Sequence, residues 1–113
     1  PYHLDMAKQI AGRLALTFVH EMESRVQHII DERERLSAAM AALPIDVFPS
    51  GANFILFRLR CLGGREVWQG LLDRDVLVRD CSGWPRLENC LRVTIGTAEE
   101  NDLFLKALTE VTA

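Results

Sequence analysis

Residues 90–101 read CLRVTIGTAEEN, and this stretch joins the signal for a strand to the signal for the start of a helix. Apolar residues occupy every second position at its beginning, namely Leu91, Val93 and Ile95. Arg92 and Thr94 lie between them, so the pattern predicts a strand with one apolar and one polar face. Thr97 and Glu100 have the spacing of a capping box, which begins a helix. A strand leading directly into a helix indicates mixed α and β structure.

The neighbouring stretches of sequence extend this interpretation. The final helix is expected to bury one apolar face, formed by Leu103, Phe104, Ala107, Leu108 and Val111. Further strands are expected over 45–48, over 54–57 with both faces covered, and over 76–78 leading into Arg79. A short helix between the last two would present Val67, Trp68, Leu71 and Leu72 on one face. The fold class is therefore α+β, with about four strands covered by helices.

The first third of the chain is expected to be helical. Asp5 is a suitable N-cap for a helix with an apolar stripe of Met6, Ile10, Leu14 and Phe18. A second, long amphipathic helix is expected to bury Met22, Val26, Ile29, Ile30, Leu36, Met40 and Leu43, and Pro44 should end it. The predicted organisation is thus a helical lead-in over 1–43 and a small α/β sandwich over 44–113.

Composition sets limits on the class of protein. With 113 residues, 49% of them hydrophobic, and a net charge of −3, the chain is expected to be one soluble domain without a basic face for nucleic acid. Its apolar runs are too short for a membrane helix, and its start has no signal-peptide pattern. A chain that opens on Pro1 is expected to be a piece of a longer protein. The three cysteines are odd in number and lack CxxC spacing, so we expect free thiols in a reducing cytoplasm and no zinc site.

No complete catalytic constellation is visible in the sequence. The histidines are scattered over the helical part and are expected to be structural or exposed: His3, His20 and His28. Lys8 and Lys106 fall on predicted helices and do not resemble a desolvated Schiff-base lysine. Two strand-borne arginines, Arg79 and Arg92, could bind an anion through the guanidinium fork. The alternative is that they form salt bridges with Asp80, Glu88 or Glu99, and residue type alone leaves both possibilities open.

Four motifs closely resemble the carboxyl end of the histidinol-phosphate aminotransferase family. LVRD at 77–80 is similar to the family's (I/V)-R-D strand, and residues 90–101 are similar to its C-L-R-(V/I)-T-(V/I)-G-T-x-E-E-N segment. PSGANF at 49–54 and PYHL at 1–4 match two further family segments. The resemblance therefore covers essentially the whole chain. One departure is Asp75, which stands where relatives usually have Gly and is expected to tolerate a left-handed conformation.

This resemblance implies a function that the residues alone do not show. The chain would be the small C-terminal domain of a fold-type I aminotransferase dependent on pyridoxal 5'-phosphate, active in histidine biosynthesis as a cytoplasmic homodimer. The Schiff-base lysine and the other cofactor groups would lie in the large domain, so this piece alone is expected to bind no cofactor and to be inactive. Arg92 would bind the substrate carboxylate, and Arg79 would assist at a second anion, the substrate phosphate.

Two alternatives remain at this stage. A relative of the same fold, such as a threonine-phosphate decarboxylase or an aromatic aminotransferase, would share the anion-binding arginines, because fold does not fix the substrate. A stand-alone, non-catalytic ligand-binding module of the ACT-like kind would explain the small sheet and the missing catalytic groups.

Overall fold

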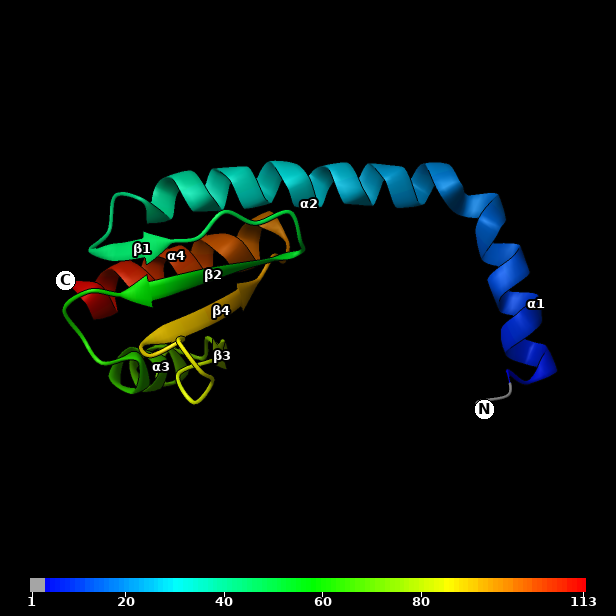
Figure 1. Cartoon of the computed structure of the whole chain (residues 1–113). Coiled ribbons are helices and arrows are strands. Elements are labelled where there is room, and N and C mark those ends of the chain that lie inside the picture. The colour runs from blue at the N-terminus through cyan, green and yellow to red at the C-terminus, as the bar shows by residue number, and fades with distance from the viewer. Residues whose placement is uncertain (1–3) are drawn as a thin grey trace.

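The computed structural model describes residues 4–113 and contains a four-stranded antiparallel sheet in the order β1-β2-β4-β3 (Figure 1). The strands are β1 Ile45–Val47, β2 Phe54–Leu59, β3 Arg79–Asp80 and β4 Cys90–Thr94. The helices are α1 Met6–Ala15, α2 Val19–Met40, α3 Gly64–Leu72 and α4 Ala98–Thr112, with a 3-10 turn, η1, at Leu16–Phe18. The predicted α+β class with four strands is confirmed. Residues 1–3 of the PYHL motif, including His3, lie outside the described residues.

The register of β2 against β4 divides the sheet into two different faces. Ile55 lies opposite Val93 and Phe57 opposite Leu91, and all four side chains are buried on the core face. The carboxyl half of α2 and the whole of α4 cover this face. The core comprises fifteen buried apolar residues, among them Leu36, Met40, Phe104 and Leu108, which come from these two helices. Nothing within residues 4–113 covers the opposite face of the sheet in the same way, and we call it the outer face.

Two strand expectations need correction. The strand predicted over 76–78 is wrong, because the ladder with β4 contains only Arg79 and Asp80. The backbone of 76–78 is held by α3 instead: the Val76 amide donates to the Leu71 carbonyl, and the Trp68 indole donates to the Val78 carbonyl. The prediction that both faces of β2 are covered is also wrong. Its alternate residues Phe54, Leu56 and Arg58 are only half-buried, because they lie on the outer face.

Two helix expectations also need correction. The long helix ends at Met40, before Pro44, because the amides of Ala42 and Leu43 form tight turn bonds with Ala39 and Met40. In α4, Phe104, Ala107 and Leu108 are buried as expected and Val111 is half-buried, but Leu103 is 62% exposed. Position 103 lies at the margin of the apolar stripe, where α4 faces away from the core.

The expected caps are confirmed. Asp5 accepts a hydrogen bond from the Lys8 amide at the start of α1. Thr97 and Glu100 form both bonds of the capping box at the start of α4. Asp75 has a φ of 60°, the left-handed conformation expected where relatives usually have Gly.

Asn101 connects the β4–α4 turn to α2 through a buried polar network. Its amide group donates to Glu32 at 2.8 Å and to the Gly96 carbonyl, and its carbonyl oxygen accepts from the Gly96 amide. Glu32 also receives two bonds from the Arg35 guanidinium, which in turn pairs with Asp102. The bonds from Arg35, followed by that from Asn101, lower the pKa of Glu32 from its ordinary 4.5 to about 2. This network fixes α4 and the end of β4 relative to α2.

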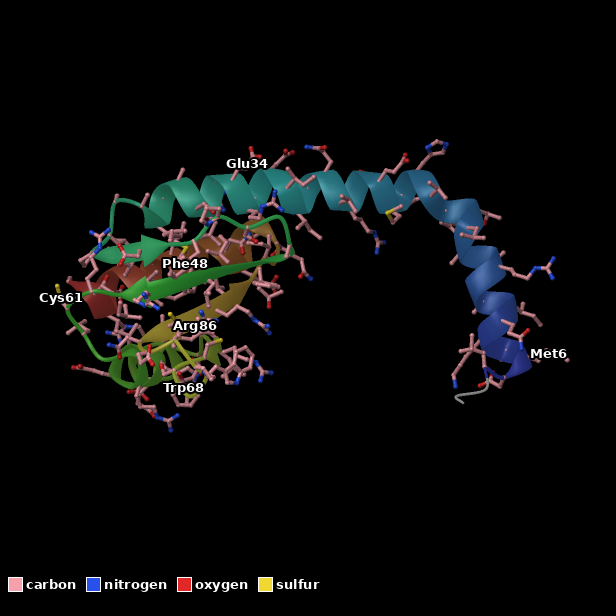
Figure 2. All side chains as sticks on the ribbon, viewed as in Figure 1. Met6, Glu34, Phe48, Cys61, Trp68 and Arg86 are labelled. Carbon is pink, nitrogen blue, oxygen red and sulfur yellow. The ribbon has the colours of Figure 1, made fainter. Side chains whose placement is uncertain are left out.

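The amino-terminal helices extend away from the sheet. No residue of α1 is buried, and Figure 2 shows its side chains, including Met6, pointing into open space. Six apolar residues at four-residue spacing along α1, η1 and α2, which we call the exposed stripe, are each exposed by 45% or more: Met6, Ile10, Leu14, Phe18, Met22 and Val26. The periodicity predicted this stripe, but not that it would lack a covering surface within residues 4–113. Within the same range, no helix combines the length and the apolar character needed to cross a bilayer.

Candidate functional site: two arginines on the outer face

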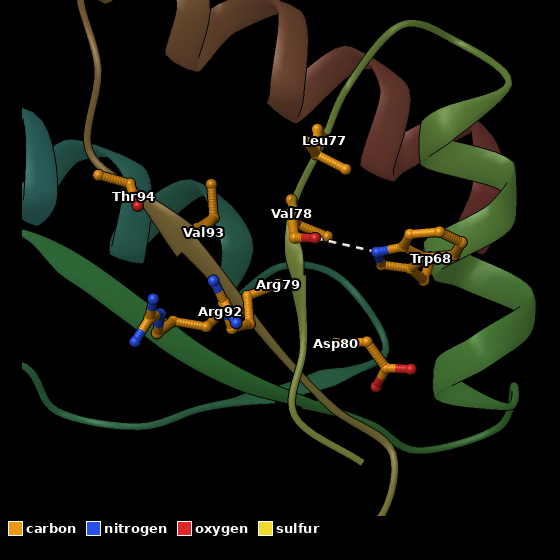
Figure 3. A pocket seen from close by; sticks show the side chains of 8 residues that line it. All are labelled: Trp68, Leu77, Val78, Arg79, Asp80, Arg92, Val93 and Thr94. Atoms are coloured by element: carbon orange, nitrogen blue, oxygen red, sulfur yellow. Dashed lines mark hydrogen bonds between the residues drawn. The ribbon is translucent and has the colours of Figure 1, made fainter. Parts of the chain in front are cut away.

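Arg79 and Arg92 are directly opposite each other across the β3–β4 pair. Because opposite residues of an antiparallel ladder point to the same side, both arginines belong to the outer face. They line a hollow of about 460 Å³, together with Trp68, Leu77, Val78, Asp80, Val93 and Thr94 (Figure 3). The two residues that the sequence singled out are therefore brought together in one place.

The charges of this pair are not balanced by acids within the described residues. Arg79 is exposed and Arg92 half-buried, and no carboxylate of residues 4–113 forms a salt bridge with either guanidinium. Like charges directly opposite in a sheet destabilise it. An anion bound between the two guanidinium groups would remove this repulsion and receive charge-assisted hydrogen bonds.

Asp80, the nearest acid along the chain, is committed to other partners. Its carboxylate accepts from the Ser82 amide at 2.9 Å and pairs with Arg65 at 3.7 Å. The bond from the Ser82 amide is the main cause that lowers the pKa of Asp80 below its ordinary value. The salt bridges from the arginines to Asp80, Glu88 or Glu99 are thus not formed in the described part of the chain.

Arg92 is held by an aromatic ring instead of an acid. Its guanidinium carbon lies over the Phe54 ring, 4.9 Å from the ring centre. Its Nε atom is buried and has no hydrogen-bond partner among the described residues. Sequence reasoning did not identify Phe54 as part of the site, because the contact depends on the register of β2 against β4. The only signal was that Phe54 ends the PSGANF motif.

Arg79 is positioned through its strand. Trp68, in α3, donates from Nε1 to the carbonyl of Val78 at 2.9 Å, immediately before Arg79. The Arg65 guanidinium, one turn earlier in α3, lies over the Trp68 indole at 4.4 Å and helps to fix the ring. The Cys81 amide donates to the Cys90 carbonyl just beyond the ladder, which continues the pairing into the following loop.

The remaining reactive side chains are not gathered around this hollow. Lys8 is exposed and paired with Asp5, and Lys106 is exposed on α4. Cys61 is exposed, whereas Cys81 and Cys90 are buried, and burial raises the pKa of the Cys81 thiol. Over residues 4–113 no group of three or more His, Cys, Asp or Glu side chains is arranged to hold a metal ion. The chemistry that this arrangement offers is anion binding.

Comparisons with known proteins agree with one another. The family model described as aminotransferase class I and II matches residues 4–108. A histidinol-phosphate aminotransferase of Aquifex aeolicus is 42% identical over 112 residues, which are 97% of this chain and 31% of that protein. The crystal structure of the histidinol-phosphate aminotransferase from Clostridium acetobutylicum has a TM-score of 0.78 at 30% identity, over 83% of this chain and 29% of that one. The structure of L-threonine-O-3-phosphate decarboxylase from Porphyromonas gingivalis has a TM-score of 0.65 at 31% identity. The match covers 74% of this chain and 26% of that one. The chain thus spans between 26% and 31% of the length of these proteins.

Proposed function

Since the chain belongs to the class I and II aminotransferase family, we propose that it is the carboxyl-terminal small domain of a histidinol-phosphate aminotransferase. The proposed reaction of the whole enzyme is transfer of an amino group between histidinol phosphate and 2-oxoglutarate. The curated relatives at about 40% identity support this substrate. The observation that carries the proposal is the pair of arginines at the β3–β4 hollow, which have no acidic partner among residues 4–113.

The role of the two arginines is to bind the anionic groups of the substrates. Histidinol phosphate carries a phosphate and 2-oxoglutarate carries carboxylates, and the planar guanidinium fork suits both kinds of anion. We assign the carboxylate to Arg92, which is half-buried in a strand, and the phosphate to the more exposed Arg79. Their direct opposition in the ladder supports one anion-binding surface to which both contribute.

The family implies pyridoxal 5'-phosphate in the whole enzyme, and the residues of this part do not fit that group. A Schiff-base lysine must be desolvated, whereas Lys8 is exposed and engaged by Asp5, and Lys106 is exposed. We therefore place the cofactor site in the preceding large domain and derive no step of the reaction from it here. The chain alone should accordingly bind no cofactor and be inactive.

The same proposal includes the arrangement of the whole enzyme. The exposed stripe on α1 and the first half of α2 supports packing of this part of the lead-in, residues 1–43, against the large domain of the same chain. The carboxyl half of α2 packs instead on the sheet domain, residues 44–113. A homodimer in the cytoplasm is the expected state of the full-length enzyme.

The test is Arg92→Lys in the full-length protein. Lysine keeps the charge but loses the two-pronged geometry, so kcat/KM should fall by the equivalent of about 2 kcal/mol, roughly 30-fold. The melting temperature should stay nearly constant, because Leu91 and Val93 on the core face are untouched. Unchanged activity, or a loss of stability in step with activity, would show that Arg92 has a structural role instead.

A second candidate is a threonine-phosphate decarboxylase, which the likeness to the Porphyromonas gingivalis enzyme favours. The two candidates are separated by assaying the full-length protein for transamination of histidinol phosphate with 2-oxoglutarate and for carbon dioxide release from threonine phosphate. Family membership sets aside the ACT-like ligand-binding module.

A further inference from the structure

We infer that Phe54 is a positioning residue that holds the Arg92 guanidinium in the orientation required to bind the substrate anion. This inference rests on the proposed function of Arg92 and extends it to a residue that does not itself line the hollow. Its basis is the stacking of the guanidinium on the Phe54 ring at 4.9 Å on the outer face.

The register of the sheet creates this contact. Arg92 is opposite Leu56, and Phe54 is two residues before Leu56 on the same face of β2. Phe54 and Arg92 are therefore diagonal neighbours, a separation that an aromatic ring and a long side chain can bridge. Both residues belong to regular strands, so neither backbone can easily move away from the other.

An aromatic ring suits this task better than an acid does. A carboxylate would also orient Arg92, but it would use the same N–H groups as the substrate anion and compete with it. The face of a phenyl ring attracts the guanidinium through its quadrupole and leaves the hydrogen bonds in the guanidinium plane free. The described part of the chain provides no carboxylate for Arg92, which agrees with this division of roles.

The chain contains a matched control. The Arg58 guanidinium lies over the Phe48 ring at 5.5 Å. Arg58 is also tied to the Arg86 carbonyl by a hydrogen bond of 2.8 Å, and neither Phe48 nor Arg58 lines the hollow of Arg79 and Arg92. Removal of the Phe48 ring therefore disturbs a similar stacked pair without disturbing the proposed anion site.

The experiment measures anion binding by the full-length protein directly, with inorganic phosphate and glutarate as unreactive probes in a calorimeter. Phe54→Leu should raise the dissociation constant of glutarate, the carboxylate probe for Arg92, about fivefold, the factor for about 1 kcal/mol of cation–π interaction. The dissociation constant of phosphate, the probe for Arg79, should change much less. Phe54→Tyr keeps a ring face and should bind like the parent. Phe48→Leu should also bind like the parent, and melting temperatures are measured for all three variants.

The double variant Phe54→Leu with Arg92→Lys separates this inference from the proposed function. If Arg92→Lys alone leaves anion binding unchanged, the proposed function fails. If Arg92→Lys weakens binding but Phe54→Leu does not, or if Phe54→Tyr and Phe54→Leu are equally impaired, the positioning role is wrong. The expected result is that Phe54→Leu has little further effect once Arg92 is lysine, because the ring acts only through the guanidinium.

Discussion

Single residues show how the same side-chain type takes different roles on the two sides of the sheet. Arg35 lies beside the core, where Glu32 and Asp102 satisfy its guanidinium. Arg92 lies on the outer face, where an aromatic ring orients it and no acid within residues 4–113 neutralises it. The first arrangement stabilises the fold, whereas the second leaves a charge available to a ligand.

The Glu32 network predicts a specific loss of stability in acid. The pKa of Glu32 is about 2 in the folded chain against an ordinary 4.5, so the unfolded chain takes up the proton first as the pH falls. The stability that Glu32 contributes is therefore complete above about pH 5 and is lost between about pH 4.5 and 2. Glu32→Gln should be less stable than the parent at pH 7 and should depend less on pH over this window.

Urea unfolding of the chain at a series of pH values between 2 and 7 measures this effect. Glu34→Gln is the matched control, because Glu34 is exposed on the same helix. If the free energy of unfolding of Glu32→Gln changed with pH in parallel with that of the parent, the lowered pKa of Glu32 would not be the cause of the loss of stability in acid.

The elements differ in how far local sequence determines them. β4 and α4 were predicted closely, because alternation and the capping box act over a few neighbouring residues. β3 was misplaced, because the Val76–Val78 segment has strand-like residues but its hydrogen bonds go to α3. Arg79 and Arg92 could be named from residue type and family resemblance. Their direct opposition and the Phe54 contact follow from strand register, which no local pattern specifies.

The Trp68 indole is expected to fix β3 against α3. In Trp68→Phe the Val78 carbonyl loses its 2.9 Å partner while most of the ring volume remains. The free energy of unfolding should fall by about 1 kcal/mol, the usual value of one hydrogen bond. Hydrogen exchange at the Cys81 amide, which donates to Cys90 across the same pair, should become faster.

Trp84→Phe serves as the control for this prediction, because Trp84 is 52% exposed in the Cys81–Asn89 loop. Equal exchange rates at Cys81 in both variants would show that α3 does not hold β3 through this bond.

At the scale of the whole molecule, the structure combines a packed sheet domain with an amino-terminal extension, α1 and the first half of α2, whose apolar stripe has no partner within the described range. The molecule measures 51 × 32 × 25 Å, because α2 extends past the sheet, and α1 bends away from the far end of α2 (Figure 1). An apolar stripe of this kind favours association. The chain by itself should therefore self-associate and bind a hydrophobic dye.

Sedimentation as a function of concentration tests this expectation. Replacing Ile10 and Leu14 by glutamate should shift the chain toward monomer and reduce dye fluorescence, since both side chains are 58–60% exposed in the middle of the stripe. Leu103→Glu, equally exposed on α4 outside the stripe, should leave association unchanged. A parent chain that stays monomeric at high concentration and binds no dye would contradict the prediction.

The anchoring of α2 at one end gives it the properties of a lever. Leu36 and Met40 are fixed in the core, whereas no residue of α2 before Glu32 is buried. The free part of α2, from Val19 to Glu32, is about 20 Å long at 1.5 Å per residue. A tilt of about 5° at Glu32 would displace Val19 by about 2 Å at this length, and α1 would move with it. Small rearrangements around Glu32 and Asn101 would thus be amplified along the helix.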